Sequence, residues 1–210
     1  RIESKIINSH IDASGFVDNG AAVILEQSIE DADGNTISEL TEMKLSLDKR
    51  ESKVIQSIWV NDVELWSVDT PALYYVRTRI YDAKDKRLLD ERKDRFGYRY
   101  FDWDVETGFS LNGQHLDIQG VCMHSDQGAL GAVANKQAFV RQLKIMKDMG
   151  VNAIRTAHNP HDEKFIEACD ELGLLVQEEA FDTWSGKPKK TYDYNRFFSQ
   201  LATHPDAEAG

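Results

Sequence analysis

Cysteine, which would point to a disulfide-rich or metal-binding protein, is scarce in the sequence. Only two cysteines occur among the 210 residues, Cys122 and Cys169. Each lies in an apolar run, so we interpret both as buried free thiols rather than as a disulfide or a metal site. They do not settle the compartment, and cytoplasmic, periplasmic and secreted locations all stay open.

Long apolar runs and a surplus of positive charge are also missing. No stretch approaches eighteen consecutive apolar residues, so we predict no transmembrane helix. The 25 Lys and Arg residues are outnumbered by 36 Asp and Glu residues, which gives a net charge of −11. Nucleic acids and anionic membrane surfaces both bind basic proteins, so neither is an expected partner. A neutral small molecule is compatible with this charge.

The amino terminus lacks the features of a complete chain. It reads Arg1-Ile2-Glu3-Ser4-Lys5, with neither an initiator Met nor the apolar region of a signal peptide. We therefore expect the sequence to have been cut from a longer protein. Hydrophobic residues make up 41% of it, which is enough for a folded core.

The first hundred residues alternate polar and apolar side chains, with turns between short runs. Residues 44–47 alternate strictly, residues 33–35 read Asp-Gly-Asn, a turn signal, and residues 73–81 are rich in aromatic and β-branched side chains. Several short strands without a helix among them predict an antiparallel β-sandwich of immunoglobulin-like size. We place this first domain at residues 1–100.

After residue 100 the pattern alternates between strands and helices. Apolar residues recur at steps of three and four over residues 139–149, which predicts an amphipathic helix, and Gly150 ends it. A second helix is expected between Asp162, a typical N-cap residue, and Gly173. Such alternation indicates parallel βαβ units. The expected strands are residues 115–123, 151–156 and 174–176.

Three strand–helix units cannot close a barrel that needs eight units and roughly 250 residues. Residues 187–210 are polar and carry no further strand signal. The second half, residues 101–210, is therefore either a small three-stranded α/β domain or the start of a truncated barrel. A truncated barrel would leave one strand with an unpaired edge, which predicts self-association.

Seven segments follow one another in a fixed order: residues 66–74, 95–99, 111–113, 120–124, 149–160, 169–173 and 178–184. Together they resemble family 2 glycoside hydrolases, and Asp126-Gln127-Gly128-Ala129-Leu130-Gly131 is similar to the β-galactosidase branch of that family. The resemblance implies an immunoglobulin-like β-sandwich followed by the first three βα units of a (β/α)8 TIM barrel, truncated. It also implies an internal fragment of a retaining, exo-acting enzyme, most closely a β-galactosidase, with a terminal β-galactoside as substrate.

Functional groups in (β/α)8 barrels lie at the carboxyl ends of the strands. Polar and aromatic side chains follow each of the three expected strands at that end. Imidazole, guanidinium and carboxylate groups hydrogen-bond sugar hydroxyls, and an indole covers the apolar face of a sugar ring. The expected substrate-binding residues are His124, Arg155, His158, Asn159, Glu179, Asp182 and Trp184.

Each of these residues also has a purely structural interpretation. Arg155 and Glu179 would then form an ion pair that holds the rim together. The pair Glu178 and Glu179 is not expected to supply an acid and a base to one bond, because adjacent strand residues point to opposite faces. The other structural alternatives are a cap for His124, a turn for Asn159 and a loop scaffold for Asp182 and Trp184.

The chemistry of a retaining glycosidase needs two carboxyl groups about 5–5.5 Å apart. The resemblance places both glutamates on later strands, the first in an Asn-Glu pair, and this sequence contains no Asn-Glu pair. We therefore expect both catalytic residues to be absent and the fragment to be inactive alone. Family members can hold Mg²⁺ and Na⁺, but Thr183 and Ser185 stand at the metal-binding positions. No metal or other cofactor is expected in the fragment.

Two alternatives to a β-galactosidase fragment stay open. The first is a different glycone, as in a β-glucuronidase or another family 2 enzyme. The second, from another class, is a carbohydrate-binding or interaction module carried by the sandwich alone. Such a module needs exposed aromatic side chains, and we expect most of Trp59, Trp66, Tyr74 and Tyr75 to lie in the core.

Overall fold

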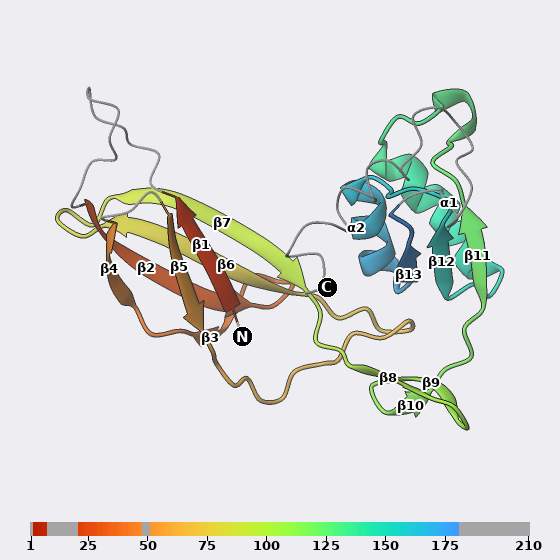
Figure 1. Ribbon diagram of the computed structural model, residues 1–210, viewed down its shortest axis with the longest axis horizontal. Coiled ribbons are helices and arrows are strands. Elements are labelled where there is room, and N and C mark those ends of the chain that lie inside the picture. Colours follow the sequence, from red (N-terminus) through yellow and green to blue (C-terminus); the bar gives the residue numbers. More distant parts are fainter. Residues whose placement is uncertain (1, 8–20, 48–50, 181–210) are drawn as a thin grey trace, which may run out of the picture. The chain divides into compact units, whose positions relative to one another are not determined.

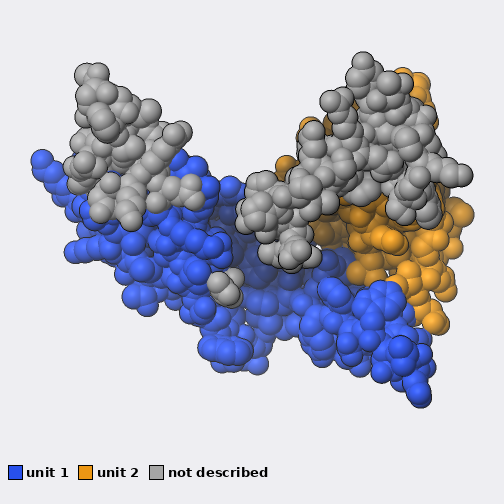
Figure 2. Space-filling view, in the orientation of Figure 1, with its two compact units in different colours: residues 1–116 blue, residues 117–210 orange. Residues whose placement is uncertain are grey.

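The computed structural model describes residues 2–7, 21–47 and 51–180. Two compact units follow one another along the chain, residues 1–116 and 117–210 (Figure 2). The predicted domain boundary at residue 100 falls earlier than this division. Asp182 and Trp184, two of the expected substrate-binding residues, lie outside the described residues.

In unit 1, two antiparallel sheets face one another as a sandwich, and a third, smaller sheet follows them along the chain (Figure 1). The smaller sheet of the sandwich pairs β1 (Ile2–Ile7) with β5 (Glu51–Gln56). The larger has the order β3-β2-β6-β7, and β4 also pairs with β2. The bounds are β2 (Ala21–Glu30), β3 (Thr36–Glu39), β4 (Met43–Leu47), β6 (Tyr74–Asp82) and β7 (Leu88–Phe96).

The core of the sandwich comes from the period-two pattern of its strands. Ile6 and Val54 of the small sheet pack against Val23, Leu25 and Leu47 of the large one. Leu25 is fully buried. Since alternate side chains of a strand point to one face, the alternating strand β4 supplies one buried face, whereas the central strand β2 is buried on both faces. The predicted antiparallel sandwich is confirmed.

The turn between β2 and β3 follows the predicted Asp-Gly-Asn signal. Gly34 has a φ of +87°, a left-handed conformation that glycine adopts without a steric penalty. A carboxylate oxygen of Asp31 accepts hydrogen bonds from the backbone N–H groups of Asp33 and Asn35, at 3.0 and 2.8 Å. The acidic side chain is therefore used to close the hairpin.

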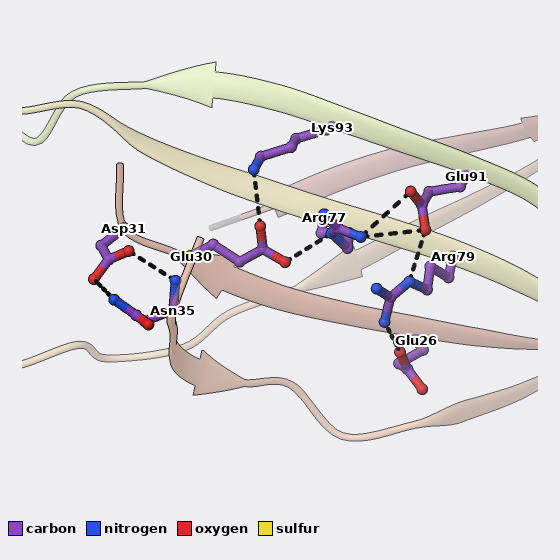
Figure 3. A network of polar contacts seen from close by, with 8 residues as sticks. All are labelled: Glu26, Glu30, Asp31, Asn35, Arg77, Arg79, Glu91 and Lys93. Atoms are coloured by element: carbon purple, nitrogen blue, oxygen red, sulfur yellow. Dashed lines mark hydrogen bonds and ion pairs between the residues drawn. The ribbon is translucent and has the colours of Figure 1, made fainter. Parts of the chain in front are cut away.

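Charged side chains on one face of the large sheet form a network across β2, β6 and β7 (Figure 3). The carboxylate of Glu30 lies 2.7 Å from Arg77 Nε and 2.9 Å from Lys93 Nζ. Glu91 pairs with Arg79 at 2.8 Å. The hydrogen bond from Lys93, and the charges of Lys93 and Arg77, outweigh the cost of burial and lower the pKa of Glu30. The charges are matched within the sheet.

The motif at residues 66–74, which leads into β6, packs against the motif at residues 95–99, which ends β7. Trp66 is 2% exposed, and its backbone N–H donates to Tyr98 O at 2.8 Å. A Cβ placed on Gly97 would lie 2.9 Å from Trp66 Cβ, so only glycine fits there without displacement. The guanidinium of Arg99 lies 4.6 Å from the Trp66 ring centre. The two motifs thus form one packing unit.

Most of the four aromatic residues Trp59, Trp66, Tyr74 and Tyr75 were expected to lie in the core of the sandwich. Trp66 and Tyr74 are buried, whereas Tyr75 is half-buried. Trp59 is 96% exposed and is the one of the four that lies outside the core. It lies in the irregular segment between β5 and β6, where no alternation fixes the direction of a side chain.

The single strand expected at residues 115–123 is two separate elements, so that prediction was wrong. A small antiparallel sheet joins β8 (Phe101–Asp104), β9 (Gly108–Leu111) and β10 (Gln114–His115). The strand β11 (Gly120–Met123) begins only after a break. In the break the Asn152 side chain donates to Asp117 O and accepts from Gln119 N–H, both at 2.8 Å. Ile118, the apolar residue in this break, is 45% exposed.

Unit 2 contains a parallel sheet in the order β11-β12-β13, with two helices on one face (Figure 1). Phe139 and Leu143 of the first helix and Phe165 of the second pack on Met123 and Ile154 of the sheet. This confirms the predicted βαβ units. The bounds are β12 (Ala153–Thr156), β13 (Leu175–Glu178), α1 (Lys136–Asp148) and α2 (Glu163–Leu172).

The helix ends follow from local chemistry. Asp162 caps α2, and its side chain accepts from Lys164 N–H at 3.0 Å. Gly173 ends it in the left-handed conformation, with a φ of +71°. Asn135 caps α1 in the same way, and its side chain accepts from Ala138 N–H at 3.0 Å. Met149, expected on the inner face of α1, is 71% exposed because it follows the last helical turn.

The two cysteines differ in exposure, which corrects one of the two assignments. Cys169 is fully buried between α2 and the sheet, as predicted. Cys122 is exposed, because Val121 and Met123 take the helix side of β11 and the residue between them faces the other way. No helix among the described residues has the length and apolar character needed to cross a bilayer.

Candidate functional site

The face of the parallel sheet that the helices leave open carries the site. In the register of the sheet, Cys122 of β11 lies opposite Arg155 of β12, and Arg155 lies opposite Gln177 of β13. The neighbouring positions Ile154 and Val176 pack towards the helices. Alternation therefore sends Arg155 to the open face at the carboxyl end of its strand.

Arg155 and Glu179 form an ion pair at this end. Glu179 follows directly after β13, and its Oε1 atom lies 2.6 Å from Arg155 Nε and 2.5 Å from Arg155 Nη2. The side chains are 33% and 21% exposed, respectively. Two guanidinium N–H groups thus meet one carboxylate oxygen, and the other oxygen is left for a second partner.

His158 supplies that second partner. Its Nδ1 atom lies 2.9 Å from Glu179 Oε2 and 3.4 Å from Arg155 Nη2. An ionised carboxylate only accepts hydrogen bonds, so a neutral His158 carries its proton on Nδ1. Nε2 is then the ring nitrogen with a lone pair. The side chain is 42% exposed, which leaves the ring accessible to a ligand.

His124 completes the cluster from the end of β11. Its ring centre lies 5.5 Å from that of His158, and the rings are nearly perpendicular at 83°. The side chain is exposed. Four of the seven expected residues, His124, Arg155, His158 and Glu179, are therefore brought together from the ends of three strands.

Asn159 lies in the same loop but outside the cluster. Its side chain is exposed, and its backbone carbonyl lies 3.2 Å from His161 Nδ1. The neighbouring ring of His161 is buried against Phe165, with ring centres 4.6 Å apart. The structure therefore gives Asn159 a turn contact through its backbone and leaves its side chain directed outward.

The electrostatics of the cluster keep the glutamate ionised. Burial alone would raise the pKa of Glu179, but the hydrogen bonds from Arg155 and His158 outweigh it and lower that pKa. The hydrogen bond from Glu179 likewise raises the pKa of Arg155. The negative charge of Glu179 therefore directly faces the positive charge of Arg155.

Sequence reasoning missed two residues of this cluster. The hydroxyl of Thr156, the last residue of β12, accepts the backbone N–H of Glu179 at 2.9 Å. Cys122 Sγ lies 3.5 Å from Arg155 Nη1, a contact within the limit for sulfur. The only sequence signal for Thr156 was a threonine at the end of an expected strand. Threonine is common in strands, so this signal alone does not mark a functional residue. Cys122 was missed because its face was assigned wrongly.

Within residues 2–7, 21–47 and 51–180, no three His, Cys, Asp or Glu side chains gather closely enough to hold a metal ion. Thr183 and Ser185, which the resemblance places at metal-binding positions, lie outside the described residues.

Family models match nearly the whole chain. The model of glycosyl hydrolases family 2 covers residues 3–99, and that of the family 2 TIM barrel domain covers residues 105–209. The first match falls on the sandwich, and the second on β9 to β13 and the residues that follow. The three parallel strands are therefore the start of a TIM barrel, which decides against a small α/β domain.

Curated relatives carry two kinds of name. A β-galactosidase of Bacteroides ovatus is 37% identical over 183 residues, which cover 87% of this chain and 21% of the relative. A putative β-glucuronidase of Formosa agariphila is 41% identical over 138 residues, or 66% of this chain and 13% of the relative. The chain thus spans about a fifth or less of the length of these relatives.

Solved structures give the same assignment. A family 2 glycosyl hydrolase of Bacteroides cellulosilyticus superimposes with a TM-score of 0.80 and 34% identity, covering 95% of this chain and 25% of that one. A β-glucuronidase of Bacteroides uniformis gives 0.78 and 29% identity over 95% of this chain and 23% of its own. With its immunoglobulin-like sandwich and the start of a TIM barrel, the chain belongs to family 2 of the glycosyl hydrolases.

Proposed function

We propose that the chain is part of a retaining, exo-acting β-glycosidase that hydrolyses terminal β-galactosides. The rim formed by His124, Arg155, His158 and Glu179 would bind the terminal sugar. The acid/base and nucleophile glutamates would come from outside residues 1–210, so this chain would position the sugar and other residues would do the chemistry.

The observation that carries the choice of sugar is the pairing of Arg155 with Glu179. A glucuronide brings a carboxylate, which needs a cation that is not already neutralised. In the described part of the rim, the only guanidinium is held by a carboxylate at 2.5 and 2.6 Å. Such a rim suits the hydroxyl groups of a neutral galactoside. The named relatives include both kinds of enzyme, so this difference in charge is what favours galactose.

The geometry supports a separate proposed role for each of these residues. His158 would accept a hydrogen bond from a sugar hydroxyl at Nε2, and exposed His124 would contact the same ring beside it. Asn159 would contribute its outward side chain. Asp182 and Trp184 are proposed as a further wall of the site, on the resemblance alone. The placement of the domain boundary at residue 100 also stays a proposal.

The alternative of a sandwich-borne binding module has one observation in its favour, the exposed indole of Trp59. The sandwich also has a groove of about 470 Å³ beside β1. Its described lining holds aliphatic and charged side chains from β1, β6 and β7 and no aromatic ring. A sugar-binding groove normally offers a flat aromatic face, so we favour the rim of unit 2.

Turnover by the full-length enzyme tests the proposal. Chromogenic β-galactoside, β-glucuronide and β-mannoside would be compared at equal concentration, with the 210-residue chain as a parallel sample. We expect the galactoside to be hydrolysed fastest by the full-length enzyme and no hydrolysis by the short chain. Preference for the glucuronide would overturn the choice of sugar. Turnover by the short chain would overturn the placement of the catalytic glutamates.

Self-association is a further proposal for the 210-residue chain. The strand β13 pairs only with β12 among the described strands, so its other edge carries backbone groups able to pair with another chain. Light scattering of the 210-residue chain should show a mass above that of a monomer. A single monomeric species across a range of concentrations would contradict it.

A further inference from the structure

The end of β13 is fixed by a side chain rather than by the sheet. The register of β12 and β13 ends at the pair Thr156 and Glu178. One residue further on, the backbone N–H of Glu179 donates to the Thr156 hydroxyl at 2.9 Å. A side-chain oxygen therefore extends the hydrogen bonding of the sheet to the residue that carries the functional carboxylate.

The position of Thr156 makes this contact well defined. Its side chain is fully buried, so water cannot replace the hydroxyl as a partner for the Glu179 N–H. A β-branched side chain also has few accessible rotamers, which keeps the oxygen in place. Without the hydroxyl, Glu179 would be the first residue after β13 with an unpaired backbone donor.

The carboxylate of Glu179 has little tolerance for a shift of its backbone. Its two oxygens serve different partners, Arg155 at 2.6 Å and His158 at 2.9 Å, which approach from β12 and from the loop after it. Both contacts can be kept only while the residue holds its direction. The contact with His158 in turn decides which ring nitrogen is offered to a ligand.

From this geometry we infer that Thr156 is a positioning residue of the sugar site. It fixes the backbone of Glu179, and through that carboxylate it holds Arg155 and His158 in the arrangement that receives hydroxyl groups. The inference rests on the proposed function for the identity of the ligand. The positioning itself concerns only residues of this chain.

Two substitutions in the full-length enzyme separate the hydroxyl from the shape of the side chain. Thr156→Val keeps the branched shape and removes the oxygen, whereas Thr156→Ser keeps the oxygen. Ile154→Val, at a buried neighbour on the same strand, serves as the control for a general loosening of β12. Hydrogen exchange of the peptide that contains Glu179, followed by mass spectrometry, reports on the backbone contact without any substrate.

We expect Thr156→Val to raise exchange at Glu179 and to raise KM for the chromogenic β-galactoside about tenfold, with a smaller change in kcat. Thr156→Ser should restore both quantities, and Ile154→Val should change neither at this site. A merely structural role would lower thermal stability equally in the Val and control variants and leave KM unchanged, which would overturn the inference.

The two measurements, hydrogen exchange and hydrolysis of the chromogenic substrate, also separate this inference from the proposed function. Unchanged exchange in Thr156→Val, in an enzyme that hydrolyses galactosides, would refute the positioning role and leave the proposed function standing. Raised exchange, restored by Ser, in an enzyme without glycosidase activity would support the positioning role and refute the proposed function.

Discussion

Glu179 divides its two carboxylate oxygens between Arg155 and His158, so a single substitution tests both contacts. Glu179→Gln removes the negative charge and leaves the guanidinium without a counter-ion. In the full-length enzyme we expect KM for β-galactosides to rise roughly tenfold, as for the loss of a charge-assisted hydrogen bond. The freed charge of Arg155 should also improve the relative use of β-glucuronide.

Steady-state kinetics with both chromogenic substrates measures this shift. The control is Glu178→Gln, a change of equal size at the exposed neighbour, which should leave both KM values unaltered. If Glu179→Gln leaves the galactoside-to-glucuronide ratio unchanged, the charge argument for a neutral sugar fails.

The two thiols should react at very different rates. Burial raises the pKa of Cys169 to about 12, so almost no thiolate exists near pH 8 and the sulfur is also inaccessible. Cys122 is exposed. Iodoacetamide should therefore label Cys122 alone in the folded chain and both residues in denaturant. Mass spectrometry of the labelled peptides checks this, and labelling of native Cys169 at the rate of Cys122 would contradict the packing of α2.

At the scale of elements, the charge network on the large sheet predicts a pH dependence. Because Lys93 and Arg77 lower the folded-state pKa of Glu30, its stabilising effect is present above its ordinary value of 4.5. It is lost as the pH falls through the lower folded-state value. Denaturant unfolding should show Glu30→Gln to be less stable than the wild type at pH 7. The two should converge only at a pH well below 4.5, where the carboxylate is protonated in the folded protein as well.

A matched variant tests whether the loss of stability comes from the ion pairs of Glu30 or only from the loss of one negative charge. Glu64→Gln removes an exposed carboxylate outside this network, and its effect should be small at both pH values. An equal, pH-independent effect of Glu30→Gln and Glu64→Gln would show that the ion pairs of Figure 3 contribute nothing specific.

Elements were predictable where one local pattern decides them. The helices were found from apolar spacing, and Asp162 and Gly173 were identified as the ends of α2 because capping depends on adjacent residues only. The break between β10 and β11 was missed because the Asn152 side chain, more than thirty residues away, makes it. The local spacing of apolar residues carries no information about a hydrogen-bond partner that distant in the sequence.

At the scale of the whole molecule, each unit has its own core. Leu25 in unit 1 and Leu143 in unit 2 are both fully buried. Replacement of either by Ala should cost about 2–5 kcal/mol. Hydrogen exchange should then show lower protection in residues 21–96 for Leu25→Ala and in residues 119–178 for Leu143→Ala. Equal loss of protection in both units for either variant would mean that they unfold together.

The sequence by itself determined the family, because ordered motifs survive without knowledge of contacts, and it determined the strand and helix types from their periods. It also indicated which strand ends carry polar groups. Only the tertiary structure decided that Arg155 and His158 both contact the carboxylate of Glu179 and that Thr156 binds the backbone N–H of Glu179. It also decided that Cys122 is exposed. These facts depend on the register between strands more than twenty residues apart, which local patterns do not encode.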